Sequence, residues 1–197
     1  MKILGITGPT GSGKTTFCQI AKNRGYYIIN CDDFARKAVL PNSPALKVLA
    51  ENFGDDIIEN DGTLNRKLLA KKAFDTPKNT EKLNSLLLPF VLKLIEEEIK
   101  VAKSLDAKVC VLDAPTLFES GADKLCDKTL GILCDKNTSF ERIVKRDNLS
   151  VDEANIRLNA VKNDDFYRNK CDFLLFNCGN LEEYKANISI FLDGIEW

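Results

Sequence analysis

The stretch "GPTGSGKT", residues 8–15, decides the fold of this chain. Its spacing, a glycine, four residues and then Gly-Lys-Thr, matches the pattern of a phosphate-binding loop, or P-loop. Glycines let the backbone turn tightly and aim successive N–H groups at phosphate oxygens. Lys14 can reach the β- and γ-phosphates, and the Thr15 hydroxyl can ligate the Mg²⁺ ion that accompanies them. The stretch therefore predicts a site for a nucleoside triphosphate with magnesium.

The sequence on either side of the loop occurs in the order that this motif requires. "KILGIT", 2–7, is an apolar run typical of a buried parallel strand, and "TTFCQIAKNRG", 15–25, has helical spacing of its apolar residues. The positive end of that helix would also face the phosphates. A glycine-rich turn without a ligand is the alternative. We predict that ATP contacts Gly8, Gly11, Ser12, Gly13, Lys14, Thr15 and Thr16.

The composition limits the possible partners. The chain has 197 residues, of which 44% are hydrophobic and 29% charged, with a formal net charge of -1. There is no basic excess to indicate nucleic acid, and no apolar run approaches the length of a membrane span. A zinc site or a histidine base is not expected, because the sequence has no histidine and its seven cysteines form no Cys-x-x-Cys pair. Cysteines within apolar runs, an odd cysteine count and the lack of a signal peptide predict a cytoplasmic protein.

Short apolar runs alternate with helical patterns along the chain. The runs lie at 2–7, 26–30, 108–113, 129–135 and 173–177. This alternation predicts an α/β fold with a five-stranded parallel sheet flanked by helices. Ligands of such sheets bind beyond the carboxyl ends of the strands. The residues that follow those ends are therefore candidates for a site: Thr7, Gly8, Asp32, Asp113, Asp135 and Asn177.

Two helical insertions interrupt the predicted core, which consists of 1–32, 107–137 and 171–197. The first insertion, 33–106, contains a long apolar helical pattern in which Pro89 should kink or end the helix. The second, 138–170, carries several basic residues: Arg142, Lys145, Arg146, Arg157, Lys162 and Arg168. No clear linker separates independent domains.

Three classes of protein use a P-loop: switch GTPases, water-activating ATPases and small-molecule kinases. A guanine-reading Asn-Lys-x-Asp sequence does occur, as "NKCD" at 169–172, but it precedes an apolar run where it should follow one. An ATPase usually carries an acidic residue directly after the magnesium-side aspartate of a strand, whereas Asp113 is followed by Ala114 and Pro115. Neither class is favoured.

A kinase needs a base near an acceptor hydroxyl, positive charge over the transferring phosphoryl group, and shelter from water. Asp32, which follows the strand at 26–30, is the candidate base. Its alternative role is to cap the helix that follows, for which Asp33 is the better candidate. The arginines of the second insertion could close over ATP and offset charge in the transition state.

The sequence resembles the dephospho-coenzyme A kinase family over nearly its whole length. The similar segments are "GITGPTGSGKTT" (5–16), "YYIINCDDFAR" (26–36), "SPAL" (43–46) with "FG" (53–54), "DGTLNRKLL" (61–69), "VLDAPTLFESG" (111–121), "ERIVKRDNLSVDEANIRLNA" (141–160) and "CDFLLFNCG" (171–179). The resemblance implies transfer of the γ-phosphoryl group of ATP to the ribose 3′-hydroxyl of dephospho-CoA. It also implies that 33–106 is an acceptor-binding domain and that 138–170 is a lid.

The resemblance assigns roles to single residues. It makes Asp32 the base, Lys14 and Thr15 the phosphate and magnesium contacts, and Arg146 the arginine of the lid. The residues that match the acceptor side are Thr7, Arg36 and, within "DAPTLFE", Asp113, Leu117 and Glu119. Asn177 and Gly179 match a loop near the adenine.

Three positions depart from the family pattern. Asn30 replaces the first acid of the family's Asp-Ala-Asp motif, Leu88 replaces the histidine of a His-Pro pair, and Val161 replaces a glutamine. The ATP side is intact, but these changes leave room for a different acceptor, such as another small-molecule or nucleotide hydroxyl. A nucleotide-binding switch protein without an acceptor is a third possibility. We expect a monomer or a weak homo-oligomer, without a nucleic-acid or membrane partner.

Overall fold

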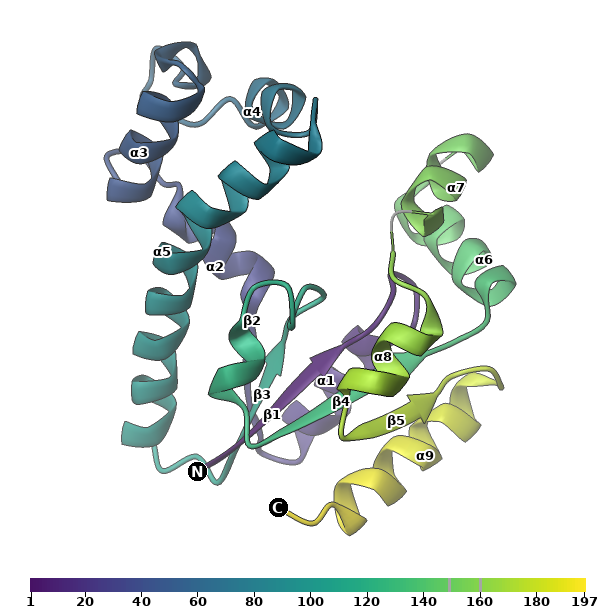
Figure 1. Cartoon of the computed structure of the whole chain (residues 1–197). Coiled ribbons are helices and arrows are strands. Elements are labelled where there is room, and N and C mark those ends of the chain that lie inside the picture. Colours follow the sequence, from purple (N-terminus) through teal and green to yellow (C-terminus); the bar gives the residue numbers. More distant parts are fainter. Residues whose placement is uncertain (149, 160) are drawn as a thin grey trace. The chain divides into compact units, whose positions relative to one another are not determined.

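The computed structural model describes residues 1–148, 150–159 and 161–197 (Figure 1). Leu149 and Ala160, which belong to the segment predicted as a lid and to its motif at 141–160, lie outside the described residues. The chain divides into two compact units. The first comprises Met1–Ile29 and Ala102–Trp197, and the second comprises Asn30–Val101. The predicted lid thus falls within the first unit, and its closure over ATP stays a prediction.

The first unit is built on a sheet of five strands in the order β2-β3-β1-β4-β5. The strands are β1 (Lys2–Thr7), β2 (Tyr27–Asn30), β3 (Val109–Asp113), β4 (Lys128–Leu133) and β5 (Phe173–Phe176). The central strand β1 pairs in parallel with β3 and β4, and β4 pairs in parallel with β5. The predicted α/β fold with a parallel five-stranded sheet is therefore confirmed, and the strands end within two residues of the expected positions.

Helices α1 (Lys14–Asn23) and α9 (Leu181–Gly194) cover one face of this sheet (Figure 1). The side chains alternate along β1, so Leu4 and Ile6 point into a core shared with Phe17 of α1 and Tyr184 of α9. All four side chains are almost completely buried. This packing fixes the end of β1 against the start of α1, and hence the loop between them.

The opposite face of β1 is approached too closely for any side chain at position 5. A Cβ atom on Gly5 would lie 2.6 Å from the Cys126 Sγ atom and 2.9 Å from the Leu117 side chain. Leu117 belongs to the segment after β3, which also contains the short helix η2 (Ala122–Leu125). Helix α8 (Asp164–Lys170) covers the same face further along, where Tyr167 lies close to Gly131 of β4.

The remaining helices of the first unit are α6 (Lys136–Asp147) and α7 (Val151–Asn159). Asp135 caps α6, because its carboxylate accepts the Thr138 N–H at 2.8 Å. The two helices pack through a small buried cluster that includes Ile143, Ala154 and Leu158. They lie side by side in Figure 1.

The second unit is helical. Its elements are α2 (Cys31–Ala38), α3 (Pro44–Phe53), η1 (Asp55–Ile57), α4 (Arg66–Ala73) and α5 (Pro77–Ser104), whose last residues extend into the first unit. Residues of several of these elements form its core: Val39, Leu49, Ala50, Ile57, Leu69, Ala73 and Leu83. Of the two effects expected at Pro89, a kink or an end, the end does not occur, because helix α5 runs through this residue. Pro89 is exposed, and buried Leu83 and Val91 hold the helix on either side of it.

The start of α2 corrects another expectation. The helix is capped by Asn30, whose side-chain oxygen accepts the Asp32 N–H at 3.0 Å. Asp33 is therefore not the cap, and it lies with Asp32 in the first turn, where both carboxylates are exposed. The departure from the family pattern at Asn30 thus has a local structural role. No helix among the described residues combines the length and the apolar character needed to cross a membrane.

We predict that Asn30→Ala lowers the free energy of unfolding by about 1 kcal/mol, because the first turn of α2 loses its capping acceptor. Asn30→Asp should retain the stability, since a carboxylate caps equally well. Urea unfolding followed by circular dichroism measures both variants. Equal loss of stability in the two variants would exclude the capping role.

Candidate active site

The loop at residues 8–13 joins β1 to α1 and requires glycine at fixed positions. Gly8, Gly11 and Gly13 have φ angles of 140°, 79° and 106°, which side chains rarely tolerate. A Cβ atom on Gly8 would collide with the carbonyl oxygen of Ile132, and one on Gly13 would collide with the amide of Asn177. The glycines therefore serve both the turn itself and the close approach of β4 and of the segment after β5.

Side chains from several parts of the first unit donate hydrogen bonds to the carbonyl oxygens of this loop. Lys14 Nζ donates to the carbonyls of Gly8 and Pro9, at 2.7 and 2.9 Å. The Tyr184 hydroxyl donates to the Gly13 carbonyl at 3.1 Å. Within the loop, the Ser12 N–H also donates to the Pro9 carbonyl, at 3.3 Å. Helix α1 begins directly after the loop, and no side chain of its N-cap residue, Gly13, binds the N–H groups of its first turn. The start of a helix with uncapped N–H groups favours the binding of an anion.

Asn177 and Arg142 hold the middle of the loop. Asn177 Nδ2 donates to the Ser12 carbonyl at 2.8 Å, and Arg142 Nη1 donates to the Gly11 carbonyl at 3.3 Å. The two side chains also bind each other, since Arg142 Nη2 donates to Asn177 Oδ1 at 3.1 Å. Asn177 is only 4% exposed. Its amide is therefore committed to the loop and to Arg142.

A buried cysteine also contacts the Gly11 carbonyl, to which Arg142 donates. Cys134, at the end of β4, has its Sγ atom 3.7 Å from the Gly11 carbonyl oxygen and 2.8 Å from Ser139 Oγ. Burial raises the pKa of the Cys134 thiol, so the protonated form is favoured. The thiol thus acts as a neutral polar group beneath the loop.

The ends of β1 and β3 are joined next to the loop. The Thr7 hydroxyl donates to the Pro115 carbonyl at 3.0 Å, and Thr7 is 1% exposed. At the end of β3, Asp113 interacts with the Cys18 thiol of α1 through a hydrogen bond. Burial is the main reason that the pKa of Cys18 lies far above its usual value, and the charge of Asp113 adds to the effect. Cys18 therefore stays a neutral thiol, one turn after Lys14.

Arg146, the arginine predicted for the lid, forms a bidentate contact with Asp147. Its Nε and Nη2 atoms donate to the two carboxylate oxygens at 2.7 and 2.9 Å. Arg157 of α7 donates to the same carboxylate at 2.6 Å. The hydrogen bond from Arg146 is the main cause that holds the pKa of Asp147 below its usual value. The same bond raises the pKa of Arg146.

Comparison with known proteins identifies a family. The family model described as dephospho-CoA kinase matches residues 2–183. A dephospho-CoA kinase of Corynebacterium glutamicum is 36% identical over 186 residues, which are 94% of this chain and 93% of that protein. One of Clostridium tetani is 35% identical, over 94% of this chain and 82% of its own length. The chain belongs to the dephospho-CoA kinase family.

A solved member of this family has the same fold. The dephospho-CoA kinase from Campylobacter jejuni superimposes with a TM-score of 0.72 at 25% sequence identity, over 98% of this chain and 96% of that one. The resemblance to the family that the motifs indicated is therefore confirmed. The protein is a kinase with a P-loop fold.

The first unit brings together most of the residues that were predicted to bind ATP or the acceptor. These are Thr7, Gly8, Gly11, Ser12, Gly13, Lys14, Thr15, Thr16, Asp113, Asn177 and Gly179. Leu117 is also in this unit but is completely buried against β1, whereas Glu119 is exposed. Asp32 and Arg36 belong to the second unit. The roles assigned to all these residues stay predictions.

Three supporting side chains of the P-loop were not singled out from the sequence. Arg142 was noticed only as one basic residue among several, Cys134 only as a cysteine within an apolar run, and Tyr184 was not considered. For Arg142 a signal existed, because it lies four residues before Arg146 and so on the same side of a helix. Tyr184 and Cys134 carried no signal, since their contacts with Gly13 and Gly11 join positions more than 120 residues apart.

The sequence "NKCD" does not form a guanine site. Asp172 precedes β5, and its Oδ2 atom accepts from the Thr129 N–H at 2.8 Å and from the Thr129 hydroxyl at 2.7 Å. It thereby joins the amino ends of β4 and β5, while the P-loop follows the carboxyl end of β1. The aspartate of "NKCD" therefore forms a structural contact between two strands.

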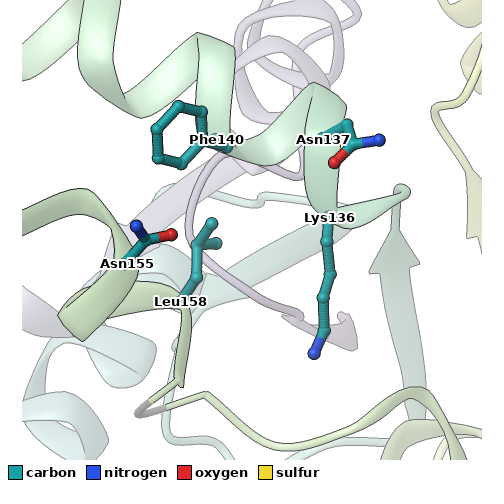
Figure 2. A pocket seen from close by; sticks show the side chains of 5 residues that line it. All are labelled: Lys136, Asn137, Phe140, Asn155 and Leu158. Atoms are coloured by element: carbon teal, nitrogen blue, oxygen red, sulfur yellow. The ribbon is translucent and has the colours of Figure 1, made fainter. Parts of the chain in front are cut away.

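A pocket of about 340 Å³ lies between α6 and α7 (Figure 2). It is lined by Lys136, Asn137, Phe140, Asn155 and Leu158. The lining has one ammonium group and two amides but no carboxylate and no nucleophile. This pocket therefore lacks the base that phosphoryl transfer needs, and none of its lining residues belongs to the P-loop.

We predict that Arg142→Ala weakens ATP binding about tenfold or more, because Gly11 and Asn177 lose a charged donor. Arg142→Lys should have an intermediate effect, since it keeps the charge but not the fork of donors. Calorimetric titration with ATP and Mg²⁺ measures both. Lys145→Ala is the matched control on the same helix, because Lys145 is exposed. Equal affinity in the Arg142→Ala variant and the wild type would contradict the supporting role of Arg142.

Proposed function

We propose that this kinase transfers the γ-phosphoryl group of ATP to the ribose 3′-hydroxyl of dephospho-CoA, which gives CoA and ADP. The observation that carries the proposal is a P-loop whose carbonyls are engaged by side chains, in a chain that matches the dephospho-CoA kinase family from residue 2 to residue 183. The acceptor is an alcohol, so the reaction requires a base, charge compensation and exclusion of water.

The phosphates of ATP fit the loop between β1 and α1. The Ser12 hydroxyl is completely buried and has no hydrogen-bond partner among the described side chains and backbone. Gly13, at the start of α1, has no side chain to cap the first turn. A phosphate group would supply acceptors for the Ser12 hydroxyl and for the N–H groups of the first turn of α1. Lys14 lies at the loop already, and would exchange its contacts with Gly8 and Pro9 for phosphate oxygens.

The donor set next to the loop also fits Mg²⁺. Thr15 is in the first turn of α1 and offers a hydroxyl, and the Asp113 carboxylate interacts with Cys18 of the same helix. Magnesium prefers oxygen ligands and keeps several sites for water and phosphate, so two protein ligands suffice. When bound, the ion would neutralise phosphate charge during transfer.

Asp32 is the proposed base, and Arg146 the proposed lid arginine. The exposed carboxylate of Asp32 follows β2 by two residues and accepts no N–H of its own helix, because Asn30 performs the capping. It is therefore available to hold and accept the proton of an acceptor hydroxyl. Arg146 would offset negative charge on the transferring group together with Lys14.

The remaining assignments follow the family resemblance. Thr7, Arg36, Asp113, Leu117 and Glu119 are proposed for the acceptor side. For Thr7 and Leu117 the contribution would be to the wall of the site, since both side chains are buried in the protein. Asn177 and Gly179 are proposed for the adenine side, where the Asn177 side chain acts through the loop that it supports.

We also propose a reducing compartment such as the cytoplasm, since all seven cysteines are free. The monomeric or weakly oligomeric state stays part of this proposal. ATP and dephospho-CoA are its small-molecule partners.

We predict that wild-type protein releases ADP from ATP and Mg²⁺ only in step with CoA formation when dephospho-CoA is present. Asp32→Asn should lower kcat by about 10²- to 10⁴-fold, because the acceptor hydroxyl loses its base. Lys14→Ala should lower kcat/KM for ATP by a similar factor, because a charge is lost at the phosphates. Coupled ADP release with mass spectrometry of the product measures both.

Asp33→Asn is the matched control, because Asp33 lies in the same first turn and is also exposed. Its carboxylate forms an ion pair with Arg36 of the same helix, at 3.4 Å. The Asp33→Asn variant should retain turnover. Full kcat in Asp32→Asn would remove Asp32 from the mechanism. ATP binding without CoA formation in the wild type would instead overturn the acceptor, and turnover with another alcohol would identify its replacement.

A further inference from the structure

Asp147 accepts hydrogen bonds from two arginines that belong to different helices. Arg146, beside it at the end of α6, binds both carboxylate oxygens. Arg157 of α7 binds Oδ2, the oxygen that also accepts from Arg146 Nη2. One carboxylate is thus shared between the arginine proposed to meet ATP and a second arginine.

The surroundings make a cationic partner more important for Asp147 than a carboxylate is for either arginine. The Asp147 side chain is 23% exposed, whereas those of Arg146 and Arg157 are 58% and 51% exposed. Asp147 is also the last residue of α6, where the helix dipole disfavours negative charge. Removing the partner of opposite charge therefore destabilises the Asp147 carboxylate more than it destabilises either exposed arginine.

We propose that Asp147 and Arg157 are positioning residues for Arg146. Asp147 holds the Arg146 guanidinium until the phosphates of the nucleotide take it over, and Arg157 then remains as the cation of Asp147. The inference rests on the proposed function, in which Arg146 offsets phosphate charge. Arg157 acts only through Asp147 and touches no substrate.

The number of cations and anions explains why the second arginine is needed. When Arg146 moves from a carboxylate to a phosphate, it exchanges one anionic partner for another, and its own charge stays compensated. Asp147 loses a bidentate partner in that exchange. When Arg157 is present, Asp147 keeps one charged hydrogen bond, so moving Arg146 from Asp147 to a phosphate costs little free energy. Without Arg157 the carboxylate would be left alone, and Arg146 would stay on Asp147.

This arrangement predicts effects of opposite sign. Arg157→Ala should weaken the binding of ATP with Mg²⁺ and lower kcat/KM for ATP, each by about tenfold, because Arg146 is retained on Asp147. Asp147→Asn should tighten ATP binding by about threefold, because the amide holds Arg146 less strongly. Asp147→Asn combined with Arg157→Ala should bind ATP within about threefold of the wild type, a coupling that a double-mutant cycle measures.

Two further variants test the route of the effect. Arg157→Lys keeps the charge and should fall between the wild type and Arg157→Ala. In an Arg146→Ala background, Arg157→Ala should cause no additional loss, because Arg157 acts through Arg146. Asp193→Asn is the matched control: it breaks the exposed pair with Arg24, which lies at the far end of α1 from the P-loop, and should leave ATP binding unchanged. Thermal unfolding of each variant checks that the fold is retained.

The outcomes separate the inference from the proposed function. Wild-type ATP affinity in Arg157→Ala would overturn the inference, and so would a double variant as weak as Arg157→Ala alone. A loss of affinity from Arg157→Ala that persists in the Arg146→Ala background would show that Arg157 contacts ATP directly, which also overturns it. The calorimetric titrations need no acceptor. If the wild type made no CoA, the proposed function would fail. The ATP affinities of the variants would still test the inference.

Discussion

The carbonyl oxygens of the phosphate-binding loop must find hydrogen-bond donors, and the first unit is arranged around this requirement. A loop that directs its N–H groups at an anion necessarily turns its carbonyls toward the protein. Those carbonyls receive donors from the helix that follows the loop, from α6, from the segment after β5 and from α9. The order of the strands allows this, because β4 and β5 lie on one side of β1 and bring α6 and Asn177 to the loop.

The same requirement connects the loop to the arginines of α6. Arg142 binds the loop and Asn177, and one turn later Arg146 binds Asp147. Residues four apart lie on the same side of a helix, so a single element carries both an arginine that shapes the phosphate site and one proposed to meet its ligand. Arg142 is committed to carbonyl and amide oxygens, which it can bind without a nucleotide. Arg146 binds a carboxylate, and a phosphate can replace that carboxylate because both anions accept paired hydrogen bonds from a guanidinium group.

The second unit shows how a departure from a family motif can preserve a structural role. Asn30 lacks the charge of the aspartate that the family has there, but asparagine and aspartate are comparable N-caps. The capping contact to the Asp32 N–H is accordingly present. Leu88 lies partly buried within α5, next to exposed Pro89. A leucine there continues the apolar side of the helix, whereas the histidine of the family would offer a polar group.

The sequence by itself determined the parallel α/β sheet, the P-loop and the family. Apolar runs, helical periodicity and the glycine spacing are local signals, because strands, turns and helix starts depend on residues close together in the chain. Local signals misjudged the cap of α2, since neighbouring residues compete for a cap. They also left open whether the helix at Pro89 kinks or ends, and core packing decided that it continues. Only the tertiary structure decided that Tyr184, Cys134 and Arg142 support the loop, and that Arg157 shares Asp147 with Arg146. These contacts join segments that are distant in sequence or lie on different helices. A tyrosine or an arginine can serve many partners, and the packing of the helices on the sheet selects one.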